Sequence, residues 1–295
     1  MLRQFAILGV ALALAGCAST GGTTARPAVA SPRPSGASHH ATAVRQERAI
    51  LASFHPPAGA KRLDGPPSGV DDNLGLRPGT SGRSTNILSG VQWWQAVGDP
   101  QAVLAAVPVP AGASKNVSSS GGSQWTQGFA WPPVAGVISD QELSISTTAW
   151  HGRTIVRVAA EVIWYPDRTA ATMIPTGASA VTVIERPGFG VKAKAYGPVQ
   201  VTAPGTVAAI VKVVNQDPVS PVGPVYHCPL DDGATMALTF RSTAATVATT
   251  SIKLTGCGSV TVAVTGGGKA TLIGGGDMAK KIESLIGVDW PTTVR

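Results

Sequence analysis

Few side chains in this sequence could do acid–base or nucleophilic chemistry, and they lie far apart. The 295 residues include 5 His, 3 Cys and 16 Asp or Glu. His55, His151 and His227 follow the polar N-terminal segment, and none lies in a recognisable catalytic motif. A Ser-His-Asp triad needs no proximity in sequence, but the G-x-S-x-G turn that presents a nucleophilic serine is missing. We therefore expect a protein that is not an enzyme.

Acidic and glycine-rich segments have the composition of ligand-binding loops but not their spacing. Asp231-Asp232-Gly233 lacks the alternating oxygen ligands of a calcium loop. Gly266-Gly267-Gly268-Lys269 is followed by Ala270, whereas a phosphate-binding loop needs Ser or Thr there. The second glycine triplet, 274–276, precedes a predicted helix, and anion binding at that helix N-terminus is the alternative to a simple turn. Zinc-type Cys or His pairs are missing as well, so we expect neither a metal nor a cofactor.

The first 17 residues have the pattern of a secretory signal. Arg3 precedes an apolar run that ends at Leu14, and small residues follow. The run has about a dozen residues, fewer than the roughly 20 that a membrane-spanning helix needs. Leu14-Ala15-Gly16-Cys17 resembles the bacterial lipobox, and this resemblance implies that the Cys17 thiol receives diacylglycerol before the chain is cleaved. We expect a lipoprotein signal peptide at 1–16 and a lipid-anchored Cys17 on the outer face of the cytoplasmic membrane.

Export also bears on the two remaining cysteines, Cys228 and Cys257. Thiols outside the cytoplasm tend to be oxidised, so we expect them to form a disulfide. Closing a loop of about 30 residues stabilises a fold by roughly 3.5 kcal/mol in the chain-entropy model. The alternative is a nucleophilic Cys228 with the neighbouring His227.

The net charge of +7 is concentrated close to the predicted anchor. Residues 18–83 carry eight Lys and Arg against four Asp and Glu, whereas residues 84–295 carry fourteen against twelve. A basic segment near a membrane suits anionic lipid head groups or wall polymers. A nucleic-acid partner is disfavoured, because the protein is exported and the main part of the chain has no basic stripe.

Composition and periodicity divide the mature chain into three parts. Residues 17–45 are rich in Ser, Thr, Ala, Gly and Pro and predict a flexible tether, in which His39-His40 is solvated. Residues 46–198 predict an α+β domain, and residues 199–291 predict a smaller α+β domain that contains the disulfide. Two segments of the larger domain share a short helix that runs into a Pro-Ala-Gly-Ala turn: 50–60 and 103–113.

Apolar periodicity predicts mainly antiparallel sheets with a few covering helices. Residues 206–215 and 277–286 carry the helical spacing of apolar residues, and the second helix ends at Gly287. Asp99 is the expected N-cap of the helix that begins at Pro100. Alternating or β-branched runs predict strands at 124–131, 142–150, 154–165, 178–185, 235–241, 245–254, 259–265 and 270–273.

Tryptophan is the commonest aromatic residue, with 7 Trp against 5 Phe and 3 Tyr. Trp93 and Trp94 are adjacent in a predicted strand and therefore point to opposite faces, which leaves one of them for a partner. With Arg157 and Arg168 they form our candidate binding surface. Filling of the core is the alternative role for each tryptophan.

Several segments together resemble a group of actinobacterial cell-envelope lipoproteins with no established activity. In that group a Glu precedes the second proline of the W-x-P-x-R…P stretch, but Thr172-Met173 stand before Ile174-Pro175 here, so Arg168 must find another partner. The resemblance spans most of 46–290 and implies only location and fold. Its residues are Ala111-Gly112-Ala113, Val156-Arg157-Val158, Trp164-Tyr165-Pro166-Asp167-Arg168, Cys228-Pro229-Leu230-Asp231-Asp232-Gly233, Leu238-Thr239-Phe240 and Gly256-Cys257-Gly258-Ser259-Val260.

These observations predict a non-enzymatic, lipid-anchored envelope protein that presents a binding surface outside the membrane. The partner we expect is an envelope protein or a wall polymer. The first alternative is a carrier that holds an apolar ligand, such as an acyl chain, between sheet and helices. The second alternative is a cell-wall hydrolase of unfamiliar type.

Overall fold

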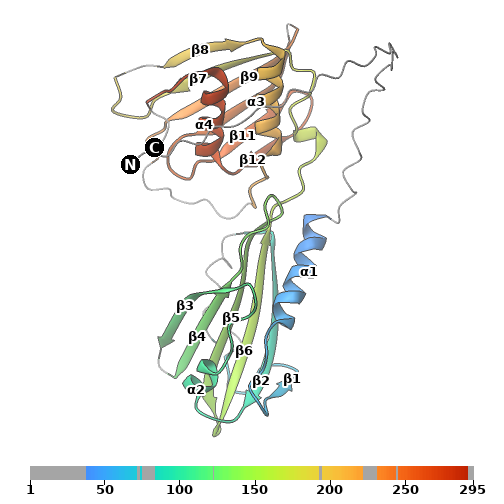
Figure 1. Cartoon of the computed structure of the whole chain (residues 1–295), viewed down its shortest axis with the longest axis vertical. Helices are drawn as coiled ribbons and strands as arrows, with labels where there is room; N and C mark the ends of the chain where they lie inside the picture. The colour runs from blue at the N-terminus through green and yellow to red at the C-terminus, as the bar shows by residue number, and fades with distance from the viewer. Residues whose placement is uncertain are drawn as a thin grey trace, which may run out of the picture. The chain divides into compact units, whose positions relative to one another are not determined.

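The computed structural model describes residues 38–71, 74, 84–121, 123–192, 195–221, 231–243 and 245–291. Within this part of the chain the strands form two six-stranded sheets, and every pairing between strands is antiparallel (Figure 1). α-Helices cover each sheet, so the expected α+β class is confirmed. The predicted signal peptide, Cys17, His227 and Cys228 lie outside the described residues.

The first sheet has the strand order β1-β2-β6-β5-β4-β3. Two helices pack on one of its faces: α1 on β2, β5 and β6, and α2 on β4, β5 and β6 (Figure 1). The bounds of these elements are α1 His39–Ala52, β1 Lys61–Leu63, β2 Ile87–Ala96, α2 Pro100–Ala105, β3 Ser114–Gly121, β4 Gln124–Ala130, β5 Ile138–Trp150 and β6 Arg153–Trp164.

The core of the first sheet lies under these helices. The strand predicted at 154–165 is β6, and its alternating residues Val156, Val158 and Val162 are fully buried on the helix-covered face. Phe129 of β4 and Ile50 of α1 belong to the same buried cluster. The period of two that predicted strand β6 therefore also identifies the face that the helices cover.

Helix α1 begins within the predicted tether. Ser38 is its N-cap and accepts a hydrogen bond from the backbone N–H of Ala41 at 3.2 Å. His39 Nδ1 lies 2.8 Å from the carbonyl oxygen of Tyr165, and the His40 ring packs against Trp164 with centroids 4.9 Å apart. The histidine pair is thus part of helix α1, and residues 39–45, which were predicted to belong to the tether, are helical.

The repeated helix-and-turn segment is confirmed, and both copies lead into an edge strand of the first sheet. In the turn after α1, the N–H of Ala60 donates to the carbonyl of Pro57 at 3.0 Å. In the turn after α2, the N–H of Ala113 donates to Pro110 at 3.1 Å. The glycine of each turn is left-handed, with φ of 74° and 75°, a conformation that glycine adopts without steric cost. Each copy therefore places one edge strand, β1 or β3.

The second sheet has the strand order β12-β11-β10-β9-β7-β8. The predicted domain boundary between residues 198 and 199 cuts through β8, so the chain changes sheets earlier, between Trp164 and Ala180. The elements of this part are η1 Ala170–Thr172, β7 Ala180–Arg186, β8 Tyr196–Val201, α3 Pro204–Gln216, β9 Thr235–Ser242, β10 Ala245–Lys253, β11 Val260–Val264, β12 Lys269–Leu272 and α4 Gly275–Ile286.

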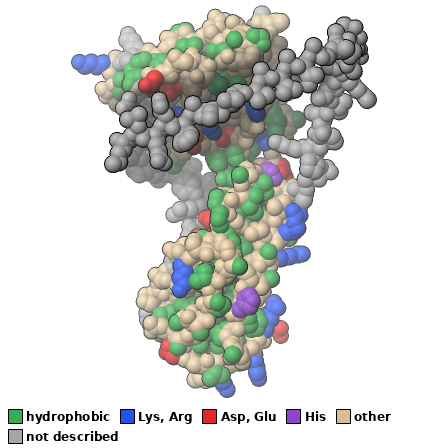
Figure 2. Space-filling view, in the orientation of Figure 1, with side chains coloured by type: hydrophobic (Ala, Val, Ile, Leu, Met, Phe, Trp, Pro, Cys, Tyr) green, Lys and Arg blue, Asp and Glu red, His purple; other side chains and the backbone are tan. Residues whose placement is uncertain are grey.

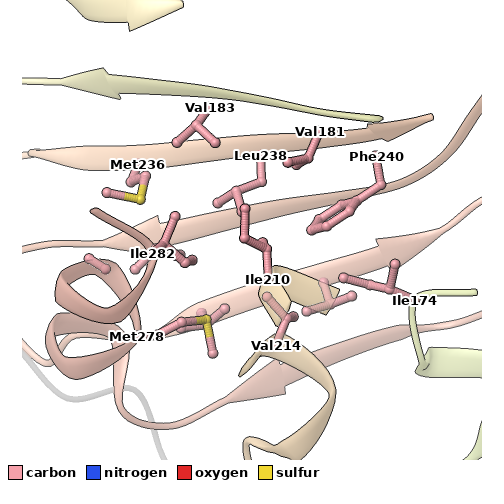
Figure 3. Close-up of a cluster of buried hydrophobic side chains, with 14 of the residues drawn as sticks. Ile174, Val181, Val183, Ile210, Val214, Met236, Leu238, Phe240, Met278 and Ile282 are labelled. Atoms are coloured by element: carbon pink, nitrogen blue, oxygen red, sulfur yellow. The ribbon is translucent and has the colours of Figure 1, made fainter. Parts of the chain in front are cut away.

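Helices α3 and α4 bury their apolar stripes against the second sheet. Ile210 and Val214 of α3 and Met278 and Ile282 of α4 point towards the strands (Figure 3). The buried residues of α3 are valines and an isoleucine, which have modest intrinsic helix propensity. Burial of this apolar stripe therefore stabilises α3. Helix α4 ends at Gly287, whose φ of 70° gives the left-handed C-cap that was predicted.

Cys257 lies in the turn between β10 and β11 and is exposed. Its predicted partner, Cys228, lies outside the described residues, so the Cys228–Cys257 disulfide stays a prediction. None of the described helices combines the length and apolar composition needed to cross a membrane.

Candidate binding groove

A polar groove lies at one edge of the first sheet, between α2 and the β3–β4 hairpin. Its volume is about 340 Å³, within the range of roughly 300 to 1,000 Å³ typical of small-molecule sites. Helix α2 contributes Gln101 and Leu104, and β4 contributes Trp125 and Gln127. We call this site the α2–β3 groove.

Strand β3 forms the outer wall of the groove with hydroxyl groups and one ammonium group. Ser118, Ser120 and Lys115 line the groove and are exposed to solvent. Lys115 is the one charged side chain among the described lining residues. The described lining residues include no carboxylate and no imidazole.

Helix α2 is held in a fixed position by its N-terminal contacts. The Asp99 carboxylate accepts hydrogen bonds from the N–H groups of Gln101 and Ala102 at 2.9 and 3.1 Å, which confirms the predicted N-cap. The buried Thr147 hydroxyl donates to the carbonyl of Pro100 at 3.0 Å. These bonds tie the start of α2 to β5 and thereby fix the groove wall that Gln101 belongs to.

The floor of the groove is a rigid part of the sheet. Trp125 and Gln127 share the helix-covered face of β4 with the fully buried Phe129. The Ser118 hydroxyl donates to Gln127 Oε1 at 2.9 Å, and Gln127 Nε2 donates to the carbonyl of Gly128, also at 2.9 Å. Hydrogen bonds to β3 on one side and β5 on the other hold β4, so these side chains are positioned before any ligand binds.

Trp125 differs from Trp131 and Trp150 in its hydrogen bonding, whereas Trp94, on β2, likewise has a buried indole N–H without a partner. Trp131 Nε1 donates to the carbonyl of Ala111 and Trp150 Nε1 to that of Ser68, both at 3.1 Å. No acceptor is found for the Trp125 indole N–H within the described part of the chain. Trp125 therefore has both a partly exposed ring and a donor available to a ligand.

The four residues of the predicted binding surface do not come together on one exposed face. Trp93 and Arg157 are each only 7% exposed, and they are register neighbours on β2 and β6. The Arg157 guanidinium lies 6.0 Å from the centre of the Trp93 ring, at the limit of a cation–π contact. Trp94 points to the opposite face, as predicted, and packs there against Phe54 with centroids 5.9 Å apart.

Arg168, the fourth of these residues, binds the C-terminal end of α3. Its guanidinium donates to the carbonyl of Val214 in the last turn and, at 2.9 Å, to that of Thr172. A cation at a helix C-terminus satisfies free carbonyls and interacts favourably with the helix dipole. Helix carbonyls are thus the partner that Arg168 finds here in place of a glutamate.

A half-buried carboxyl group that the sequence did not reveal, that of Asp217, lies beside Arg168. Burial raises the pKa of Asp217 to about 6, although Lys281 and Arg168 lower it by charge attraction. The nearby Asp277 carboxylate adds to the rise. A Cβ at Gly274 would lie 3.3 Å from Asp217 Oδ1, so the carboxyl group packs close against the start of α4.

Two further histidines, His55 and His151, contact residues close to them in the sequence. His55 Nδ1 lies 2.8 Å from the carbonyl oxygen of Ser53, and the His151 ring packs edge-on against Trp150. Both side chains are exposed. Among the described residues no group of three or more His, Cys, Asp and Glu is arranged to hold a metal ion.

Uncharged side chains dominate the face of the molecule in Figure 2, where the described Lys and Arg residues are scattered. Sequence reasoning missed the groove because Gln101, Ser120 and Trp125 belong to three separate segments without a shared motif. The available signal was the occurrence of Ser and Gln around Trp125 in a β hairpin.

Comparisons with protein-family models, curated proteins and solved structures found no match to this chain.

Proposed function

We propose that this chain is a lipid-anchored envelope protein that binds a polar ligand outside the cytoplasmic membrane, without catalysis. The observation that carries the proposal is the α2–β3 groove, in which a half-buried Trp125 adjoins the exposed polar side chains of Gln101 and Ser120. Polar groups around one aromatic ring are typical of binding sites. The described lining residues include no carboxylate and no imidazole, which gives the hydrolase alternative less support than the binding function.

The location rests on the N-terminal sequence. The lipobox-like Leu14-Ala15-Gly16-Cys17 supports acylation at Cys17, and the basic excess in residues 18–83 supports a position close to anionic lipids or wall polymers. Two or more acyl chains anchor a protein far more firmly than one chain. The groove would then face the space in which envelope polymers lie.

The carrier alternative has less support. An acyl chain between sheet and helices needs a dry cavity, but side chains of Ile210, Val214 and Ile282 occupy the space between α3, α4 and the second sheet (Figure 3). In the first sheet, Ile50 and Phe129 occupy the corresponding layer. Each layer would have to open to admit a lipid, at the cost of its packing energy.

Metabolic labelling tests the anchor. Cells that express the full chain are grown with an alkynyl fatty acid, and the purified protein is coupled to a fluorophore. We expect the wild type and a Ser19→Ala control to be labelled and Cys17→Ala to be unlabelled. We also expect external protease to digest the wild type in intact spheroplasts. Equal labelling of Cys17→Ala, or full protection from protease, would contradict the proposed location.

A further inference from the structure

We infer that the ligand of the α2–β3 groove is a carbohydrate that carries anionic groups, an inference that rests on the proposed binding function. Sugar rings have flat C–H faces that stack on an aromatic ring and an equatorial rim of hydroxyl groups that form hydrogen bonds. The groove presents both kinds of partner, because the Trp125 ring lies in its floor and amide and hydroxyl groups lie around it. Leu104 on α2 extends the apolar part of the surface.

The hydrogen-bonding groups match a ligand with many hydroxyls. Gln101 provides an amide that can donate and accept, and Ser120 provides a hydroxyl that can do the same. The Trp125 indole N–H, which has no acceptor in the described structure, adds a fixed donor. A ligand that brings both donors and acceptors satisfies this set, whereas an aliphatic ligand would leave buried polar groups unpaired.

The charge in the groove selects among sugars. Lys115 is exposed on β3, and the other described lining residues are uncharged. A neutral sugar binds through stacking and hydrogen bonds alone. A sugar with carboxylate groups gains a screened attraction to Lys115, which we expect to be worth a small factor in affinity at low salt.

A peptide is the less suitable occupant, although β3 is an edge strand. Edge strands bind extended peptides when their hydrogen-bonding groups are regular and exposed. Strand β3 instead has a register shift between Lys115 and Val117, and the lysine lies beside it. Irregularities and edge lysines are the features with which sheets prevent the addition of further strands.

Fluorine NMR of the full chain labelled with 5-fluorotryptophan tests the inference. The protein is held in a zwitterionic detergent without a sugar head group, and the Trp125 resonance is assigned from Trp125→Phe. The probes are a tetramer of N-acetylglucosamine and a tetramer in which N-acetylglucosamine alternates with glucuronate. We expect both to shift the Trp125 resonance saturably and to leave that of Trp150, on the opposite face of the same sheet, unchanged.

Variants make the test specific. We expect Trp125→Ala to weaken binding at least tenfold and Gln101→Ala to weaken it about two- to fivefold, while Trp150→Ala binds as the wild type does. The glucuronate tetramer should bind two- to fivefold more tightly than the neutral one in 20 mM salt. This preference should disappear in 500 mM salt and in Lys115→Gln. Thermal melts of all variants separate loss of binding from loss of folding.

The outcomes distinguish this inference from the proposed function. If neither tetramer moves the Trp125 resonance but a peptide fraction of the envelope does, the carbohydrate inference is overturned and the binding function remains. If no fraction of an envelope extract moves that resonance, both are overturned. If the tetramers bind Trp125→Ala and the wild type equally, binding occurs elsewhere and the groove is not the site.

Discussion

Adjacent glycines at the start of α4 give a test of how tightly the second sheet packs. A Cβ at Gly275 would lie 2.7 Å from the carbonyl carbon of Gly258 and 2.9 Å from the carbonyl oxygen of Lys253, and closer still to the Gly258 oxygen. These are backbone atoms, so the overlap cannot be relieved by rotation of a side chain. A Cβ at Gly276 would meet nothing within 4 Å. Alanine at these two positions thus makes the same chemical change in opposite surroundings.

The expected cost of Gly275→Ala has two parts. Relieving the overlap by moving backbone costs about 1 to 3 kcal/mol, as overpacked cores do. The movement also weakens the hydrogen bond from the Gly275 N–H to the Gly258 carbonyl, 2.7 Å long, which is worth about 1 kcal/mol. Gly276→Ala has no such cost and gains about 0.5 to 1 kcal/mol, because alanine loses less backbone entropy than glycine in a helix.

Urea unfolding of the full chain measures the difference. The transition is followed through the 5-fluorotryptophan resonance of Trp290, which packs in the core of the second sheet. We expect Gly276→Ala to be as stable as the wild type or slightly more stable, and Gly275→Ala to be less stable than Gly276→Ala by about 3 kcal/mol. If the free energies of unfolding of the two variants differ by less than about 0.5 kcal/mol, the start of α4 does not pack closely against the turn before β11.

Three further measurements follow from the structure. The pKa of Asp217 is raised to about 6 by burial, so its contribution to stability is fully present below pH 4 and is lost as the pH rises towards 6. Asp217→Asn should therefore stabilise the protein at pH 8 by about 1 kcal/mol after solvent screening, and no gain in urea denaturation would refute this. Asp99→Ala should cost about 1 kcal/mol and loosen the groove, seen as faster amide exchange in α2. Reduction of the predicted Cys228–Cys257 disulfide should cost roughly 3.5 kcal/mol, and thiols that alkylate without reductant would disprove it.

The sequence predicted the elements whose apolar residues recur with a clear period. Strand β6 and helix α3 are the best examples, because burial on one face enforces a period of two in a strand and of 3.6 in a helix. The N-cap at Asp99 and the C-cap at Gly287 were equally predictable. Asp99 accepts hydrogen bonds from N–H groups in the first turn of its helix, and Gly287 ends its helix in a left-handed conformation. These features depend on neighbours in the sequence.

The elements that the sequence did not predict have no such local pattern. Strand β3 has the sequence Ser-Lys-Asn-Val-Ser-Ser-Ser-Gly and forms because β4 offers hydrogen bonds along its edge. Strand β8 contains Gly197-Pro198, a pair that usually marks a turn, and it is tolerated because β8 lies at the edge of its sheet. The start of α1 was missed because His39 and His40 follow a polar segment and are fixed by contacts with the distant Tyr165 and Trp164.

The groove was unpredictable for the same reason. Its three parts are brought together by the β3–β4 register and by the Thr147 contact that positions α2. Trp125 could be placed in a strand from sequence, but its exposure could not, because exposure depends on where α2 ends. The burial of Arg157 could not be predicted either. Its position in the strand showed only that its side chain points to the face opposite Val156 and Val158.

Photocrosslinking in living cells tests the central claim most directly. A benzophenone amino acid replaces Ser120 in the groove or, as a control, the exposed Ser251 on β10 of the second sheet. We predict a light-dependent, high-mass adduct from position 120 that glycan-cleaving enzymes reduce to a discrete mass, and no such adduct from position 251. Equal adducts at both positions, or an adduct at 120 that only protease removes, would contradict carbohydrate binding in the groove.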